Sequence, residues 1–144
     1  MLISTKGRYA LRMMLDLAQN DTGEPVKLKD IASRQYISEK YCEQIIAILN
    51  KAGYVRSVRG AQGGYLLASP PSQYTAGQIL RLTEGDLSAV QCISEGSDFC
   101  ARTTSCVTRK LWQQVTDAVN GILDNTTLED LLSWGPSKGD DYVI

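Results

Sequence analysis

The first half of the chain combines two short helical patterns with a glycine-rich hairpin pattern, and this combination restricts the fold more than any other feature. Apolar residues recur at helical spacing over 28–34, and again after Ser38, a good N-cap, until Gly53 ends the second helix. Two short strands, 54–58 and 64–67, then flank a glycine-rich loop. A helix-turn-helix followed by such a hairpin predicts a winged helix-turn-helix domain, so we expect a mainly α-helical protein with one small β-hairpin.

Helical patterns also occur before and after this unit. Ser4 or Thr5 can cap a first helix, which the turn-forming segment 20–25 ends. Thr75 can cap a short helix that runs through Leu82. With 144 residues, the chain is long enough for one core with an appended helix and too short for two independent domains.

The longest helical pattern begins at about Thr108 and carries an apolar stripe that is too broad for a small winged domain to cover. The matching helix of a second copy would cover it, so we expect a homodimer with two-fold symmetry. Alternatively, the stripe folds back onto its own domain. The segment 126–129 fits a capping box for one last short helix over 128–134. The members of the stripe are Leu111, Trp112, Val115, Ala118, Val119, Ile122 and Leu123.

Charge is distributed unevenly along the chain, although the formal net charge is −1. Residues 1–70 hold ten Lys or Arg and six Asp or Glu, a net +4, whereas residues 71–144 hold five and ten, a net −5. A basic face in the first half is what phosphate binding uses. The second helix of a helix-turn-helix enters the major groove, and arginines near a wing tip can reach a minor groove. We therefore expect double-stranded DNA as a partner, contacted by Ser38, Lys40, Tyr41, Glu43, Gln44, Arg56, Arg59 and Gln62.

Several other classes of function find no support in the sequence. Histidine is absent, which removes the commonest general base, and the glycine-rich loop lacks the ending of a nucleotide-binding loop. We therefore expect no enzymatic activity. The start of the chain does not resemble a secretory signal and no apolar run could span a bilayer, so we expect a cytoplasmic protein without a membrane partner. A protein-interaction module without catalysis is the alternative to a DNA-binding protein.

Three of the four cysteines, Cys92, Cys100 and Cys106, lie close together, in or directly after the irregular segment 84–105. A loop can bring such thiols to one centre, and thiolates select zinc, copper(I) or iron–sulfur clusters. The spacing lacks the C-x2-C pair that zinc sites commonly contain. Alternatively, the three are free or redox-labile thiols without a metal. The fourth, Cys42, is expected to be a small packed residue.

Four segments and the three loop cysteines match the pattern of a known family. The segments are 4–10, 38–44, the wing 58–65 and 128–131. On these residues the chain resembles the Rrf-two family of bacterial winged-helix regulators, and within it the IscR-type regulators that sense iron–sulfur cluster status, oxygen, nitric oxide or iron. The resemblance implies a [2Fe–2S] cluster, alternatively a [4Fe–4S] cluster, on Cys92, Cys100 and Cys106. It also implies that Glu43 reads a base and that Arg59 enters the minor groove.

Two positions depart from the family pattern. In IscR-type regulators a histidine three positions after the last cysteine is the fourth ligand, whereas this chain has Arg109, which stays protonated and cannot replace it. Nitric-oxide-sensing relatives use an acidic residue near the N-terminus, where this chain has Arg8. The fourth ligand is therefore unknown, with Glu95, Asp98, Cys42 or an exogenous group as candidates. The alternative function is a metal-free thiol-redox or cysteine-metabolism repressor of the same fold.

These interpretations divide the chain into four sections. Residues 1–83 are expected to form the winged helix-turn-helix DNA-binding domain, and 84–106 a cysteine-containing cluster-binding loop. Residues 107–134 are expected to form the dimerisation helix and a short C-terminal helix, and 135–144 a flexible tail. A cluster-assembly or cysteine-synthesis protein is a further candidate partner.

Overall fold

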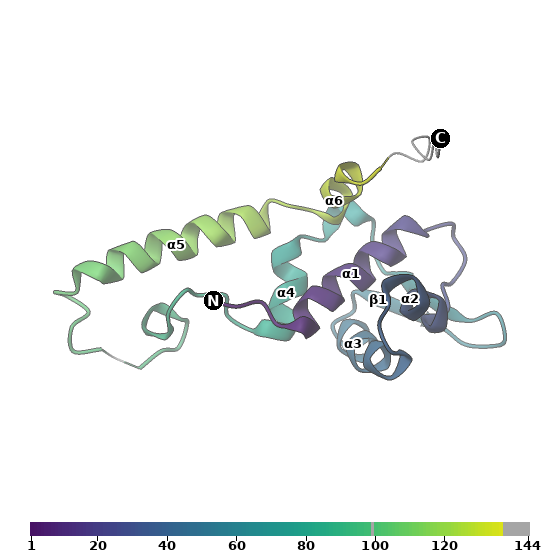
Figure 1. Cartoon of the computed structure of the whole chain (residues 1–144), viewed down its shortest axis with the longest axis horizontal. Coiled ribbons are helices and arrows are strands. Elements are labelled where there is room, and N and C mark those ends of the chain that lie inside the picture. Colours follow the sequence, from purple (N-terminus) through teal and green to yellow (C-terminus); the bar gives the residue numbers. More distant parts are fainter. Residues whose placement is uncertain (99, 137–144) are drawn as a thin grey trace.

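Five helices and a two-stranded hairpin pack together, and the long helix α5 projects from this body (Figure 1). The computed structural model describes residues 1–98 and 100–136, so most of the predicted tail, 135–144, lies outside the described residues. As predicted, the fold is mainly α-helical with one β-hairpin. The elements are α1 (Thr5–Gln19), α2 (Leu28–Gln35), α3 (Glu39–Lys51), β1 (Val55–Val58), β2 (Gly64–Leu67), α4 (Ala76–Glu84), α5 (Val107–Asp124) and α6 (Leu128–Trp134), with 3-10 turns η1 (Pro71–Gln73) and η2 (Gln91–Ile93).

Hydroxyl side chains cap the N-termini of three helices at positions that the sequence predicts. The Ser4 hydroxyl accepts a hydrogen bond of 3.1 Å from the backbone N–H of Gly7, so Ser4 rather than Thr5 caps α1. Ser38 caps α3 in the same way, and Thr75 caps α4 within a complete capping box. These caps satisfy amides that the start of a helix leaves without an intrahelical partner.

The capping box of α6 lies one residue later than predicted. Thr127 caps the helix and Asp130 completes the box, through hydrogen bonds of 3.0 and 2.9 Å. The predicted pair, Thr126 and Glu129, does not form because the Thr126 hydroxyl donates to the carbonyl of Ile122 in α5. The end of α5 therefore decides which threonine is free to cap the next helix.

Helix α1 forms the centre of the core, where it packs against α2, α3, α4 and α6. Within the described chain, no residue of α5 belongs to the buried apolar cluster. None of the described helices has the length and apolarity that crossing a membrane requires. Among the most deeply buried apolar side chains are Ala10, Met13, Met14, Leu17, Ile31, Cys42, Ile45, Leu49, Ile79 and Leu128.

The hairpin is fastened to the segment that precedes α2. Strands β1 and β2 pair antiparallel, with Val58 opposite Gly64 at the loop end. Next to this pair, Val26 and Tyr65 exchange two backbone hydrogen bonds of 2.9 and 2.8 Å. Because α2 begins directly after this segment, the bridge sets the position of the hairpin relative to the helix-turn-helix.

The substitution Gly64→Ala is expected to lower the free energy of unfolding by about 1–3 kcal/mol. A Cβ at this position would overlap backbone atoms of Val26 and Lys27, which cannot turn aside as a side chain can. Urea denaturation followed by circular dichroism measures the loss. Gly121→Ala is the matched control, since a Cβ there meets no atom within 4 Å. Equal stability of the two variants would contradict the expected overlap.

Helix α5 carries two adjacent apolar stripes, and one of them covers the protein's own chain. Thr116 is buried and accepts a hydrogen bond of 2.9 Å from the backbone N–H of Ala89, which marks the face turned to the loop before α5. Val119 and Leu123 are half-buried on that face. One part of the predicted apolar stripe therefore packs on the protein's own chain, as the alternative interpretation of the sequence expects. The exposed stripe consists of Val107, Leu111, Val115, Ala118 and Ile122.

An ion pair fastens α5 to α4. Arg81 donates to both carboxylate oxygens of Asp124 over 2.5 and 3.1 Å, and to the side chain of Asn120 over 2.9 Å. The bond to Asp124 is the main reason why the pKa of Arg81 lies above its usual range. Gly77 leaves room for this pair, because a Cβ there would overlap the Asp124 carboxylate. The orientation of α5 relative to the winged domain therefore depends on a polar contact near the surface.

A buried carboxylate joins α1 to α2. Asp16 is 1% exposed and accepts hydrogen bonds from Nε and Nη2 of Arg34 over 3.0 and 2.8 Å, and from Gln35 over 2.9 Å. Hydrogen bonding to Asp16 raises the pKa of Arg34. Since α2 is the first helix of the helix-turn-helix, this clamp sets the angle at which that unit leaves α1.

Candidate nucleic-acid interface and cysteine loop

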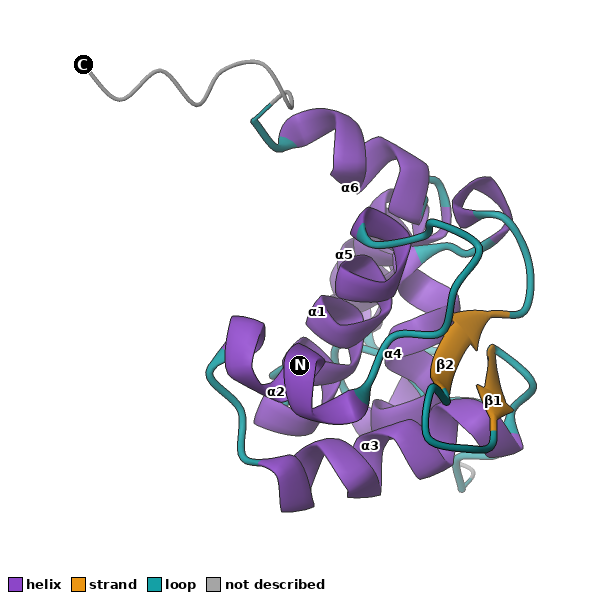
Figure 2. Cartoon of the chain, turned by 90° about the vertical axis from the view of Figure 1, so that its right-hand side faces the viewer, coloured by secondary structure: helices purple, strands orange, loops and turns teal. Residues whose placement is uncertain are grey.

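Helix α3 has one buried apolar face and one exposed polar face. Four of the predicted DNA contacts, Ser38, Lys40, Glu43 and Gln44, are exposed at its N-terminal half. Figure 2 shows α3 along the lower edge of the body with the hairpin strands beside it. This edge can approach a groove without unfolding any part of the core. The buried face consists of Cys42, Ile45, Ile46 and Leu49.

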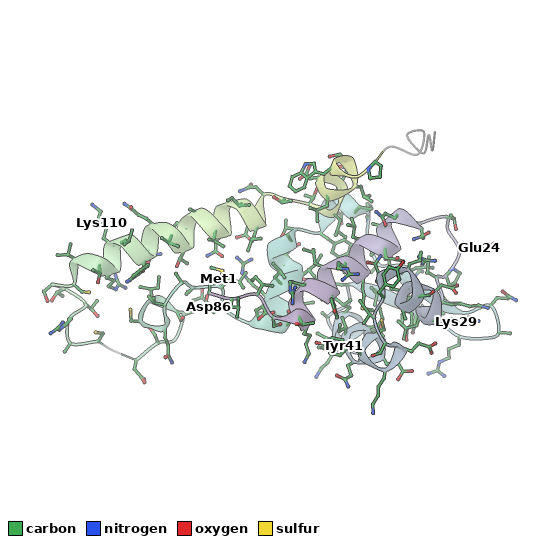
Figure 3. The ribbon with its side chains drawn as sticks, in the orientation of Figure 1. Met1, Glu24, Lys29, Tyr41, Asp86 and Lys110 are labelled. Carbon is green, nitrogen blue, oxygen red and sulfur yellow. The ribbon has the colours of Figure 1, made fainter. Side chains whose placement is uncertain are left out.

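Tyr41, the fifth predicted contact on α3, is half-buried and packs against α1 (Figure 3). Its ring lies 5.7 Å from the ring of Tyr9 in an edge-on arrangement, and the guanidinium of Arg12 lies 5.2 Å from the centre of the Tyr9 ring. Such contacts fix the N-terminal turn of α3 on the core. The structure thus gives Tyr41 a packing role, and its contact with DNA stays a prediction.

The wing carries the remaining predicted contacts. Arg56, Arg59 and Gln62 are all exposed, two of them in the loop that joins β1 to β2. Gly60 in this loop has a φ of 112°, a conformation that residues with a side chain rarely adopt. The glycine lets the chain turn tightly between the two strands, and both arginines are exposed on the hairpin. The contact of both arginines with the negative potential of a DNA groove stays a prediction.

The three loop cysteines lie in different surroundings. Cys92 and Cys100 are exposed, whereas Cys106 is half-buried at the N-cap of α5. The Cys106 sulfur lies 3.3 Å from the hydroxyl of Thr108. This hydrogen bond is the main cause of the lowered pKa of Cys106, and the backbone N–H of Arg109 adds to it. Among the loop thiols, Cys106 therefore has a distinct chemical environment.

An iron–sulfur cluster would require these sulfurs to converge with a fourth ligand. In the described part of the chain, no three Cys, Asp or Glu side chains are close enough to hold one metal ion, so neither Glu95 nor Asp98 completes a site. Arg109 is half-buried, and its Nε has no hydrogen-bond partner among the described residues. Cys42 lies in the core, where burial raises the pKa of its thiol. As arranged here, these residues do not fit a cluster.

Sequence reasoning missed the polar contacts that position the interface. Asp16 and Arg34 are 18 residues apart, and Arg81 and Asp124 are 43 residues apart. A local pattern cannot report such pairs. A charged residue such as Asp16 within an otherwise buried helical stripe is the one sequence signal that could have shown the first of them.

The exposed polar face of α3, the arginine-bearing wing beside it and the helical body define a winged-helix DNA-binding protein. The chain belongs to the Rrf2 family, whose model, described as an iron-dependent transcriptional regulator, matches residues 3–133. It is therefore a DNA-binding transcription regulator and not an enzyme, as the sequence predicts.

Relatives of two kinds are similar to this chain. The HTH-type transcriptional regulator CymR of Bacillus subtilis strain 168 is 43% identical over 144 residues, which cover 100% of this chain and 99% of CymR. The solved structure of this global cysteine regulator has a TM-score of 0.82 and covers 94% of this chain and 99% of its own. The HTH-type transcriptional regulator IscR of Cronobacter sakazakii is 40% identical over 133 residues, 92% of this chain and 81% of IscR. The solved structure of T. potens IscR is 44% identical, with a TM-score of 0.74 and coverage of 92% and 87%.

Proposed function

We propose that the protein is a dimeric repressor of the cysteine-metabolism type, whose DNA binding responds to the redox state of its loop thiols without a bound metal. The observation that carries the proposal is the similarity to CymR, which extends over 100% of this chain and 99% of that regulator. The separate positions of the loop thiols support it. Such a repressor acts in the cytoplasm, and a cysteine-synthesis protein is a candidate partner.

The exposed stripe of α5 supports the dimer. Val107, Leu111 and Ile122 are 86%, 51% and 67% exposed, although they share one face of a helix. Pairing with the same stripe of a second copy removes this apolar surface from water. A two-fold dimer then presents two α3 helices to successive major grooves.

The loop thiols can act on DNA binding through α5. Cys106 begins this helix, and the hydrogen bond between Ala89 and Thr116 fastens the loop to its side. At its other end the Arg81–Asp124 ion pair connects α5 to the winged domain. A peroxide oxidises two loop thiols to a disulfide and is itself reduced to water. The disulfide restricts the loop and favours one arrangement of α5, which changes the spacing of the two α3 helices.

An iron–sulfur regulator of the IscR type is the second candidate. Three cysteines within one loop favour it, together with the 44% identity to T. potens IscR. The loop would have to rearrange, since in the described residues the three ligands do not converge. A [2Fe–2S] or [4Fe–4S] cluster would then need a fourth ligand other than Arg109, and a cluster-assembly protein would be the partner.

Purification without oxygen, followed by iron and sulfide analysis, tests the two candidates. We expect colourless protein without stoichiometric iron or sulfide. Its affinity for a duplex selected from a random pool is expected to change at least about fivefold on treatment with peroxide, and to return with dithiothreitol. Fluorescence anisotropy of the labelled duplex measures both affinities.

A triple variant, Cys92→Ser with Cys100→Ser and Cys106→Ser, is expected to bind DNA and lose the response to peroxide. Cys42→Ala is the matched control, because this buried thiol lies outside the loop. Stoichiometric iron and sulfide with visible absorption bands would contradict the metal-free repressor and support the iron–sulfur regulator. A response that persists in the triple variant would overturn the assignment to the loop.

A further inference from the structure

Tyr36 adopts a backbone conformation that its side chain disfavours. It is the C-cap of α2, with φ 55° and ψ 44°, and its backbone N–H donates to the carbonyls of Ala32 and Ser33. Among the described residues it is the one position other than glycine with a positive φ. Glycine or asparagine occupies such left-handed caps at lower cost than a tyrosine does. The turn of the helix-turn-helix therefore carries a residue that the local backbone does not favour.

The ring of Tyr36 contributes no contact that would offset this cost. It is 93% exposed, more than any other aromatic side chain in the described part of the chain. Within that part, no side-chain hydrogen bond and no aromatic pair involves it, in contrast to Tyr9, Tyr41, Tyr54 and Tyr74. A large exposed aromatic without an intramolecular role is typical of residues that contact a partner.

The place of this ring points to the partner. Tyr36 lies two residues before Ser38, the N-cap of α3, and next to the exposed end that carries Lys40 and Gln44. In a helix-turn-helix this end of the second helix enters the major groove. The turn that precedes it then faces the rim of the groove, where the sugar–phosphate backbone runs. Tyrosine hydroxyls are among the groups that bind DNA phosphates.

We propose that Tyr36 is a DNA-contacting residue, which donates its phenol hydroxyl to a backbone phosphate at the rim of the groove read by α3. The inference rests on the DNA-binding function of the chain and is independent of the thiol chemistry. A phosphate contact positions α3 but carries no sequence information. It also neutralises no phosphate charge, because the phenol is uncharged. Its removal should weaken binding to all duplexes alike and leave the salt dependence unchanged.

Substitutions of Tyr36 test this inference, because they are expected to weaken DNA binding without lowering the stability of the fold. Tyr36→Gly and Tyr36→Asn are both suited to the left-handed backbone, so the thermal unfolding midpoint is expected to stay the same or to rise. Binding to a selected duplex and to a random duplex is expected to weaken by about tenfold in both variants. Tyr36→Phe, which lacks the hydroxyl alone, is expected to show a smaller loss, of about threefold.

Trp134→Ala serves as the control, because this ring is 71% exposed on α6, far from the helix-turn-helix in sequence. Unchanged binding in Tyr36→Gly and Tyr36→Asn would overturn the proposal and leave a protein partner as the occupant of this surface. A lower unfolding midpoint in both variants would also overturn it, because the ring would then act in the fold. If no variant, including the unaltered protein, binds duplex DNA, the failure lies with the DNA-binding function itself.

Discussion

Replacing Leu111 and Val115 together by glutamate is expected to separate the dimer and to weaken binding to a selected duplex by at least about 100-fold. These side chains are 51% and 37% exposed in the single chain, in the middle of the apolar stripe of α5. In a two-fold pair, the new carboxylates would face their own copies in a desolvated interface. A separated subunit reads one half-site and loses the effective concentration that linkage to the second subunit provides.

Light scattering gives the mass, and fluorescence anisotropy gives the affinity. Gln113→Glu is the matched control, since Gln113 lies on another face of α5, where it donates to Asp117 over 3.0 Å. This variant is expected to remain dimeric and to bind DNA as the unaltered protein does. A double variant that keeps the dimer mass would show that the α5 stripe is not the pairing surface. A monomer with unaltered affinity would separate pairing from DNA binding.

The second large effect is expected at the clamp between α1 and α2. Arg34→Ala leaves the buried Asp16 carboxylate without its two strongest donors, while Gln35 remains within 2.9 Å. We expect a loss of about 2–3 kcal/mol in the free energy of unfolding, less than for a fully buried pair because the Arg34 side chain is 40% exposed. DNA binding is expected to weaken as well, since the clamp sets the angle of the helix-turn-helix.

Urea denaturation with two variants of the same helix checks this expectation. Arg34→Lys keeps the charge but not the paired donors, so it is expected to recover part of the loss. Lys29→Ala removes an exposed charge from α2 and is expected to change stability by less than about 0.5 kcal/mol. If Arg34→Ala proves as stable as Lys29→Ala, the clamp does not hold α2 in place.

Local patterns predicted correctly which residues of α3 are exposed at its N-terminal half, and their contact with DNA stays a prediction. Ser38, Lys40, Glu43 and Gln44 were expected at the exposed start of α3, and the structure places them there. Tyr41 adjoins these residues in the sequence and is predicted to contact DNA as well, and in the structure its ring packs on Tyr9. A half-buried aromatic side chain between the buried and the exposed face of a helix can either pack on the core or contact a partner. The position of the neighbouring helix determines which of the two occurs.

The sequence by itself determined the helices, most of their caps, the hairpin and the winged-helix class, because each depends on residues a few positions apart in the chain. The tertiary structure alone decided which part of the α5 stripe is covered, which residues clamp α2 and α5, and how the loop thiols are separated. It also showed that Tyr36 has a left-handed backbone and an uncovered ring. These features depend on contacts between segments that are distant in the sequence, or on the backbone path between two packed helices. A local sequence pattern predicts neither of them.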